Sequence, residues 1–109
     1  MLALNTSYIC DQSKLDLIIR NNINGDYSIV NFLKEIKAGA FINITWNEKK
    51  LMLPYSLRKD YLSFTDNKWE WSYKLNSDGS PRFIDPTLSE LLPSGEIKKH
   101  LCQPEEKYA

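Results

Sequence analysis

The sequence has few of the residues that build recognisable active sites. His100 is the only histidine, and the four glycines lack the spacing of a phosphate-binding loop. Glu96 and Cys102 lie close to His100 in the sequence, but zinc needs four convergent ligands, and on a helix Cys102 would point away from the other two. Aspartate and glutamate occur singly, so no pair is arranged for acid–base chemistry. We therefore expect no catalytic residue, no metal and no cofactor, and we expect that the protein is not an enzyme.

The chain also lacks a net charge and a long apolar run. Its fourteen basic and fourteen acidic side chains cancel, which leaves no long-range field to attract nucleic acid or an anionic membrane. No apolar stretch approaches the roughly 20 residues of a membrane span. The first residues have neither the basic nor the apolar region of a signal peptide. We therefore expect a cytoplasmic protein that does not associate with membranes.

Cysteine is scarce as well, with Cys10 and Cys102 near opposite ends of the chain. A disulfide framework in a secreted domain usually contains more cysteines. This scarcity predicts two separate reduced thiols, with a single bridge as the alternative. Lysine outnumbers arginine eleven to three, and isoleucine and asparagine are frequent. Such a composition is typical of an AT-rich genome and indicates a bacterial or phage origin.

What the sequence does have is a row of large rings at residues 68–75. Apolar and polar residues alternate through all eight positions, which is the pattern of a half-buried β-strand. One face carries Trp69, Trp71, Tyr73 and Leu75. A buried row of this size would dominate a small core. An exposed row would instead offer rings on which nucleobases stack. We favour a core that faces the helices, because hairpins bury little unless helices cover their apolar face.

The middle of the chain predicts two antiparallel hairpins. Strands at 41–46 and 51–55, joined by a loop at 47–50, would pair Trp46 with Leu51 and Ile44 with Leu53. A turn at Asp66-Asn67 would pair Phe64 with Trp69 and Leu62 with Trp71. Every such pair is apolar on one face, so pattern and register agree. Pro54 lacks an N–H and predicts that its strand is at an edge or is ending.

The N-terminal part predicts a pair of helices. Asp11 or Ser13 would cap the first, whose apolar residues are Leu15, Ile18, Ile19 and Ile23. Asp26 or Ser28 would begin the second, with a stripe of Ile29, Phe32, Leu33 and Ile36. Gly39 would follow its end in a left-handed conformation. A brief strand at 8–10 would precede both helices.

The C-terminal part predicts a short strand at 82–84 and then short helices. The sequence at 87–90, Thr-Leu-Ser-Glu, matches a capping box, and residues 96–102 would form another short helix. From Pro104 onward a flexible tail is expected. The predicted fold is therefore α+β, with an N-terminal helical pair, an antiparallel meander of about four to five strands and short C-terminal helices. We expect one domain over residues 1–103 and a tail at 104–109.

For function, the sequence favours a small non-enzymatic module that binds a protein, such as an inhibitor or an immunity-type protein. The alternative is a nucleic-acid-binding accessory protein that uses the aromatic sheet. Tyrosine and arginine on loops beside a rigid sheet are typical of binding hot spots. The residues predicted to contact a partner are Tyr55, Arg58, Lys59, Tyr61 and Asp78.

Overall fold

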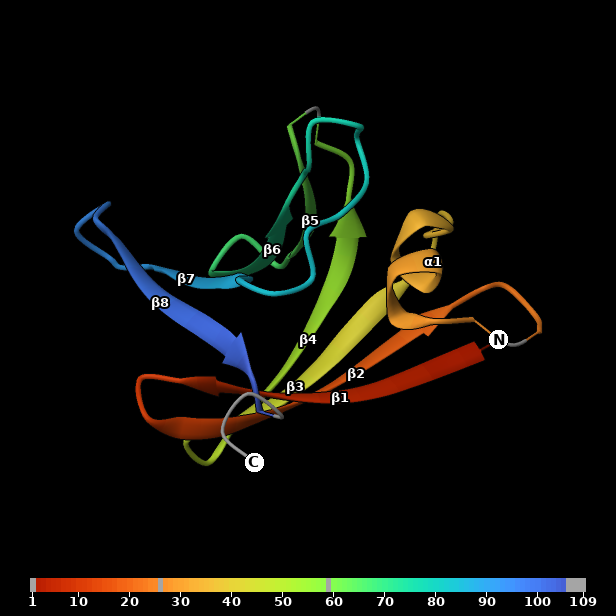
Figure 1. Cartoon of the computed structure of the whole chain (residues 1–109). Coiled ribbons are helices and arrows are strands. Elements are labelled where there is room, and N and C mark those ends of the chain that lie inside the picture. Colours follow the sequence, from red (N-terminus) through yellow and green to blue (C-terminus); the bar gives the residue numbers. More distant parts are fainter. Residues whose placement is uncertain (1, 26, 59, 106–109) are drawn as a thin grey trace.

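Eight antiparallel strands follow one another around a closed barrel, and the last strand pairs with the first (Figure 1). The computed structural model describes residues 2–25, 27–58 and 60–105. The strands are β1 (Leu2–Cys10), β2 (Ser13–Asn21), β3 (Phe41–Trp46), β4 (Lys49–Ser56), β5 (Tyr61–Thr65), β6 (Trp69–Lys74), β7 (Thr87–Leu91) and β8 (Ile97–Pro104). Among the described residues the only α-helix is α1 (Ile29–Lys34). The α+β prediction is therefore wrong, and the fold is an all-β barrel with essentially no helix.

The first predicted helix is the strand β2. Its residues Leu15, Leu17 and Ile19 are buried and alternate with less buried neighbours, which is the period of a strand. β2 pairs with β1 over its whole length. The turn between them is Asp11-Gln12, and both residues have positive φ, as a two-residue type I′ turn requires. Residues that were expected to start a helix therefore make a β-hairpin.

The second predicted helix is present as α1 but is shorter than expected. Ser28 caps it and accepts a hydrogen bond from a backbone N–H of the first turn, whereas Asp26 lies outside the described residues. Gly39 has positive φ but lies in the turn before β3, beyond the end of α1. Phe32 and Leu33 are buried in the core, so α1 packs across one end of the barrel (Figure 1). No helix in the described part of the chain is long and apolar enough to cross a membrane.

The two central hairpins have the predicted faces, but each register differs from the prediction by two residues. Ile44 pairs with Leu51, and Phe64 pairs with Trp71. A slip of two residues keeps every side chain on its predicted face, because side chains alternate with period two. In the first hairpin Asn47 and Glu48 both have positive φ, so the turn has two residues instead of the predicted four.

The β4 strand is not an edge strand, although it contains a proline. Pro54 pairs with Phe41 of β3, and the next residue, Tyr55, pairs with Phe64 of β5. Pro54 therefore lies where β4 changes its partner, a position at which a missing N–H does little damage to either ladder.

The predicted C-terminal helices are the strands β7 and β8. In β7 only Leu88 is fully buried, and in β8 the buried residues are His100, Cys102 and Pro104. Such a sparse apolar pattern does not by itself separate a strand from a short helix. The predicted strand at 82–84 is a turn. The protein therefore has eight strands rather than four or five.

The barrel closes because β8 pairs with two strands in succession. Its first five residues pair with β7 and its last three with β1. In this short seam Cys10 lies opposite Cys102, and the two form a disulfide. The prediction of two free thiols is therefore wrong. Pro104, where the tail was expected to begin, pairs with Tyr8, and residues 106–109 lie outside the described residues.

The aromatic row lines the interior of the barrel. Trp71 and Tyr73 are fully buried, and the ring of Tyr8 packs edge-on against Trp71 with 5.2 Å between ring centroids. The prediction that this row is core is confirmed for Trp71 and Tyr73, whereas Trp69 and Leu75 are only partly buried. The face is covered by the other strands of the barrel and not by the predicted helices. The largest fully buried side chains are Trp71, Tyr8, Tyr73, Phe32, Phe64, Leu15, Leu17, Ile19, Leu33, Ile42, Ile44 and Leu53. Small barrels of this kind are filled by their own side chains, so a binding surface is to be sought on the outside.

Candidate binding groove

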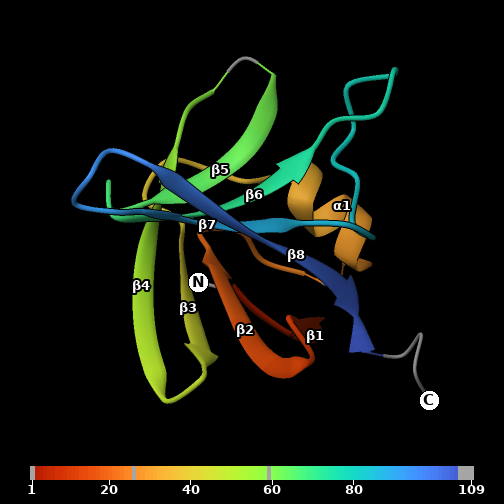
Figure 2. The ribbon, with the colours of Figure 1, turned by 90° about the vertical axis from the view of Figure 1, so that its left-hand side faces the viewer.

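A groove of about 570 Å³ runs over the outer face of β5, β6, β7 and β8. These four strands lie side by side in Figure 2, and their registers place the small hydroxyl residues Ser72, Thr87 and Ser89 next to one another. The strands bury their apolar residues inward, so the alternate positions, with these short side chains, face outward. The floor of the groove is therefore low and polar because of the same alternation that fills the core.

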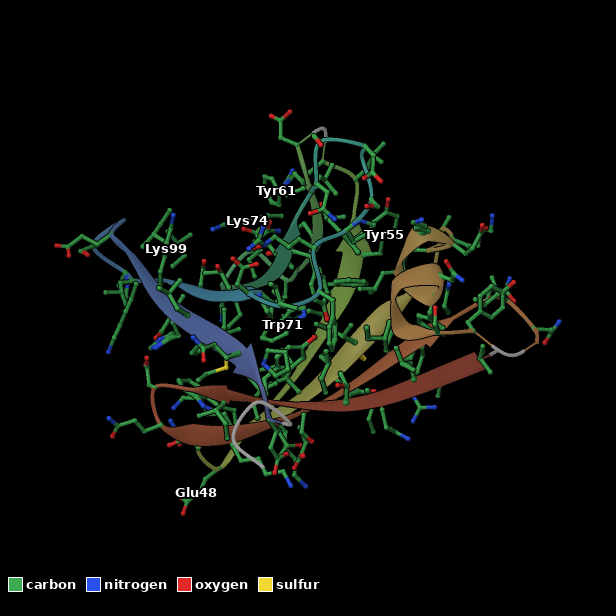
Figure 3. The ribbon with its side chains drawn as sticks, in the orientation of Figure 1. Glu48, Tyr55, Tyr61, Trp71, Lys74 and Lys99 are labelled. Atoms are coloured by element: carbon green, nitrogen blue, oxygen red, sulfur yellow. A yellow bond between two sulfur atoms is a disulfide. The ribbon has the colours of Figure 1, made fainter. Side chains whose placement is uncertain are left out.

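Larger side chains surround this floor. Arg58, Asp60 and Tyr61 line the groove from the segment that joins β4 to β5 and from the start of β5. At the opposite end, Leu91 and Ile97 face each other across the β7–β8 hairpin and are 50% and 61% exposed. Figure 3 shows Tyr61, Lys74 and Lys99 on the outer side of the sheet, whereas Trp71 lies inside the barrel. Fifteen residues line this hollow, and we call it the outer groove. They are Arg58, Asp60, Tyr61, Thr65, Asn67, Lys68, Trp69, Glu70, Ser72, Lys74, Thr87, Ser89, Leu91, Ile97 and Lys99.

One carboxylate of the outer groove is held in place by its neighbours. Glu70 accepts a hydrogen bond of 2.6 Å from the hydroxyl of Ser63, and the Nε of Arg58 lies 4.0 Å from the same carboxylate oxygen. Ser63 is itself buried. Ser63 therefore fixes the Glu70 carboxylate, and the charge of Arg58 compensates that of Glu70.

Three lysines of the outer groove have no such compensation. Lys68, Lys74 and Lys99 are exposed, and their ammonium groups form no ion pair with any described residue. Asp60 is the remaining acidic residue of the lining. The outer groove thus has a local excess of positive charge, although the whole chain is neutral.

The structure brings together two of the five residues predicted to contact a partner. Arg58 and Tyr61 line the outer groove. Tyr55 is partly buried, and its ring packs against Phe64 with 5.8 Å between centroids. Asp78 lies in the turn before Ser80 and outside the groove, and Lys59 lies outside the described residues.

The Asp78 carboxylate makes hydrogen bonds within the turn in which Asp78 lies. It accepts hydrogen bonds from the Ser80 hydroxyl at 2.5 Å and from the Ser80 backbone N–H at 2.9 Å. These bonds lower the pKa of Asp78, the hydroxyl bond most. Its role in the fold is therefore to shape the tight turn at residues 76–80.

Sequence reasoning missed the lysines and the apolar end of the groove. Lys68 and Lys74 fall on the face opposite the large rings, as the alternation at residues 68–75 predicts, but they were not among the residues predicted to contact a partner. Leu91, Ile97 and Lys99 were predicted to lie in or next to separate short helices. The sequence therefore did not predict that they lie near β6. The apolar pattern of residues 87–91 and 97–103 is too sparse to have identified these two segments as neighbouring strands.

His100 lies in β8 and not on the short helix predicted at residues 96–102. It is 5% exposed in β8, and its Nδ1 contacts the carboxylate of Asp11 in the β1–β2 turn. The ring of Trp46 packs edge-on against it at 4.9 Å, and Trp69 lies on another side. This arrangement closes the turn end of the barrel. No group of three histidine, cysteine, aspartate or glutamate residues that would suit a metal ion gathers among the described residues.

Comparison with known proteins places the chain in a family but adds no activity. Residues 18–102, from the middle of β2 to the disulfide cysteine of β8, match the family model described as "Domain of unknown function (DUF8671)". The chain therefore belongs to that family. No curated protein and no solved structure matches it.

Proposed function

We propose that this member of the DUF8671 family is a non-enzymatic module that binds a protein partner through the outer groove. One observation carries the proposal: Arg58 and Tyr61 line one end of the outer groove, and the exposed apolar pair Leu91 and Ile97 lines its other end. Tyrosine and arginine are enriched among residues that supply most of the binding energy of protein interfaces. Apolar groups surrounded by polar ones are also the usual anatomy of such interfaces.

The scaffold beneath the outer groove is well suited to binding. Its floor consists of hydrogen-bonded strands rather than loops, and the barrel has no free edge except at the strand ends. The Glu70 carboxylate in this floor is held by the hydroxyl of the buried Ser63. A surface that is already ordered loses little conformational freedom on binding, which favours affinity.

The nucleic-acid alternative loses its main support. It required the rings of residues 69–73 to be exposed for base stacking, but Trp71 and Tyr73 are fully buried. Trp69 is partly buried, with its ring beside His100. A protein partner is therefore the better match to this surface.

Photo-crosslinking from single positions tests the proposal. A photoreactive residue replaces Ser89 on the groove floor in one variant and Thr45 on the outer face of β3 in the other. Both variants are irradiated in the cells that make the protein. We expect a discrete protein adduct from position 89 and none from position 45. Adducts from position 45 alone, or from neither position, would contradict binding through the outer groove.

A further inference from the structure

We infer that the outer groove receives an extended acidic segment of the partner protein, with a large apolar side chain at the end beside Leu91 and Ile97. This inference rests on the proposed function and specifies its ligand. It follows from three properties of the groove: unpaired positive charge, the spacing of that charge, and the apolar pair at one end.

The charge of the groove selects an anionic ligand. Lys68, Lys74 and Lys99 lack acidic partners among the described side chains, whereas Arg58 is balanced by Glu70. Asp60 compensates at most one of the lysines. Carboxylates of a ligand would therefore supply the counter-charges that the barrel itself does not provide.

The spacing of the lysines selects a chain rather than a small anion. Lys68 immediately precedes β6, and Lys74 is its last residue. Lys99 lies two strands away, because Glu70 of β6 pairs with Ser89 of β7 and Ser89 pairs with Lys99 of β8. Strand geometry then places the three Cα atoms about 12 to 20 Å apart. A single carboxylate or phosphate does not span such a distance. An extended peptide covers it with about four to six residues.

The apolar end fixes the second feature of the ligand. Leu91 and Ile97 are opposite each other in the β7–β8 hairpin, and they are 50% and 61% exposed. They lie next to Lys68, whose carbonyl accepts the hydrogen bond of the Leu91 N–H at 2.8 Å. A leucine or tryptophan that follows the acidic residues of the ligand would remove this apolar surface from water. The hydroxyls of Ser72, Thr87 and Ser89 between the two ends offer hydrogen bonds to an extended backbone.

A labelled peptide tests the inference directly. The probe is a fluorescein-labelled octapeptide, Glu-Thr-Glu-Thr-Glu-Thr-Leu-Trp, titrated with the oxidised full chain and followed by fluorescence anisotropy. Two matched peptides replace every Glu by Gln, or Leu-Trp by Ser-Ser, and an eight-nucleotide oligothymidylate is the fourth probe. We expect the acidic apolar peptide to bind at least roughly tenfold more tightly than each of the others, with an affinity that falls as salt is added.

Charge reversal locates the binding in the protein. The double variant K74E/K99E should weaken binding of the acidic peptide by roughly tenfold or more. The matched control is K50E, which changes an exposed lysine on the outer face of β4 and outside the groove. Equal binding of the Gln peptide, no binding of the acidic peptide, or an unchanged affinity in K74E/K99E would overturn the inference. Tighter binding of oligothymidylate through the same lysines would overturn it in favour of nucleic acid.

The two proposals fail in different ways. If position 89 crosslinks to a partner but the acidic peptide neither binds nor displaces that partner, the function stands and the inference about its ligand is wrong. If the acidic peptide binds and no protein adduct forms from position 89, protein binding by the outer groove is wrong instead.

Discussion

Cys10 of β1 and Cys102 of β8 lie opposite each other in the seam that closes the barrel, and their disulfide joins the first strand to the last. Only three residue pairs connect β1 with β8, whereas nine connect β1 with β2. The disulfide thus reinforces the shorter of the two ladders that β1 makes. It also lies next to the contact between His100 and Asp11 that closes the turn end of the barrel.

Loss of this disulfide should destabilise the protein strongly. The two cysteines are separated by 92 residues, and in the chain-entropy model a crosslink over a loop of this length contributes roughly 4 to 5 kcal/mol. That is a large part of the total stability of a small domain. We expect the variant with both cysteines changed to serine to unfold at a much lower urea concentration than the oxidised protein. Reductant should lower the midpoint of the wild type and leave that of the double variant unchanged.

The Cys10–Cys102 disulfide also bears on the cellular compartment of the protein. Disulfides persist mainly in oxidising compartments, so the bridge counts against the cytoplasmic location expected from the sequence. Thiol titration of protein taken directly from its native cells, under denaturing conditions, checks this. We expect no titratable thiol in a non-reducing compartment, whereas two would support the cytoplasm.

Removal of the central ring should disrupt the core. Trp71 is fully buried and contacts the rings of Tyr8 and Tyr73, so Trp71→Ala should lower the free energy of unfolding by roughly 3–5 kcal/mol. Thr45→Ala, on the exposed outer face of β3, should change it by less than about 0.5 kcal/mol. Equal denaturant midpoints for the two variants would contradict the burial of Trp71.

Alkaline pH should destabilise the protein through Tyr73. Burial raises the pKa of Tyr73 from 10.0 to about 12, against the smaller opposing effects of the Tyr8 hydroxyl and then of Trp71. The Tyr8 and Tyr73 hydroxyls lie 3.4 Å apart. The indole N–H of Trp71 is near enough to favour the phenolate, although it makes no hydrogen bond of ordinary geometry with a described residue.

The sign follows from which state keeps the proton. The folded state holds the Tyr73 proton more tightly than the unfolded state, so its contribution is fully present below about pH 10 and is lost as the pH rises toward about 12. The loss amounts to roughly 2–3 kcal/mol. Denaturant midpoints measured across this range should fall less steeply for Tyr73→Phe than for the wild type. Parallel curves would mean that Tyr73 does not carry the effect.

Substitutions in the outer groove should weaken binding without altering the fold. Arg58→Ala or Tyr61→Ala removes an expected anchor, and truncation of an anchor costs about 2 kcal/mol or more of binding free energy. Asp78→Ala is the matched control, because Asp78 was predicted from the sequence to contact a partner but lies outside the groove. The yield of the adduct from position 89 and circular dichroism measure the two effects. A loss of binding in Asp78→Ala alone would place the partner at the turn instead.

His100 should affect stability rather than binding. Because its buried ring contacts Asp11 and packs on Trp46, His100→Ala should lower the free energy of unfolding by about 1–3 kcal/mol. It should also change the tryptophan fluorescence and leave the affinity for the acidic peptide unchanged. Asp11→Asn keeps a polar partner for the ring and should cost less. A fully stable His100→Ala variant that no longer binds would give His100 a functional role.

The sequence by itself determined the faces of the central strands. In residues 41–74 the alternation of apolar and polar side chains is local, so Ile44 and Trp71 were correctly expected to point into the core. The registers were not determined to better than two residues, because a two-residue slip leaves the same faces buried. In the β3–β4 hairpin, the two-residue turn at Asn47-Glu48, with positive φ at both residues, sets the register.

The tertiary structure decided everything that depends on the ends of the chain. Leu15, Leu17 and Ile19 fit both a helix and a strand, and β1 settled the choice by pairing along the whole of β2. Leu88 and His100 carry too little apolar pattern to form strands alone, and β7 and β8 exist because closure of the barrel gives each a neighbour on both sides. That closure also joins Cys10 to Cys102, and it brings Lys99, Leu91 and Ile97 into the same groove as Arg58 and Tyr61. Contacts between residues far apart in the sequence depend on the whole ladder of strands, and no local pattern of side chains encodes them.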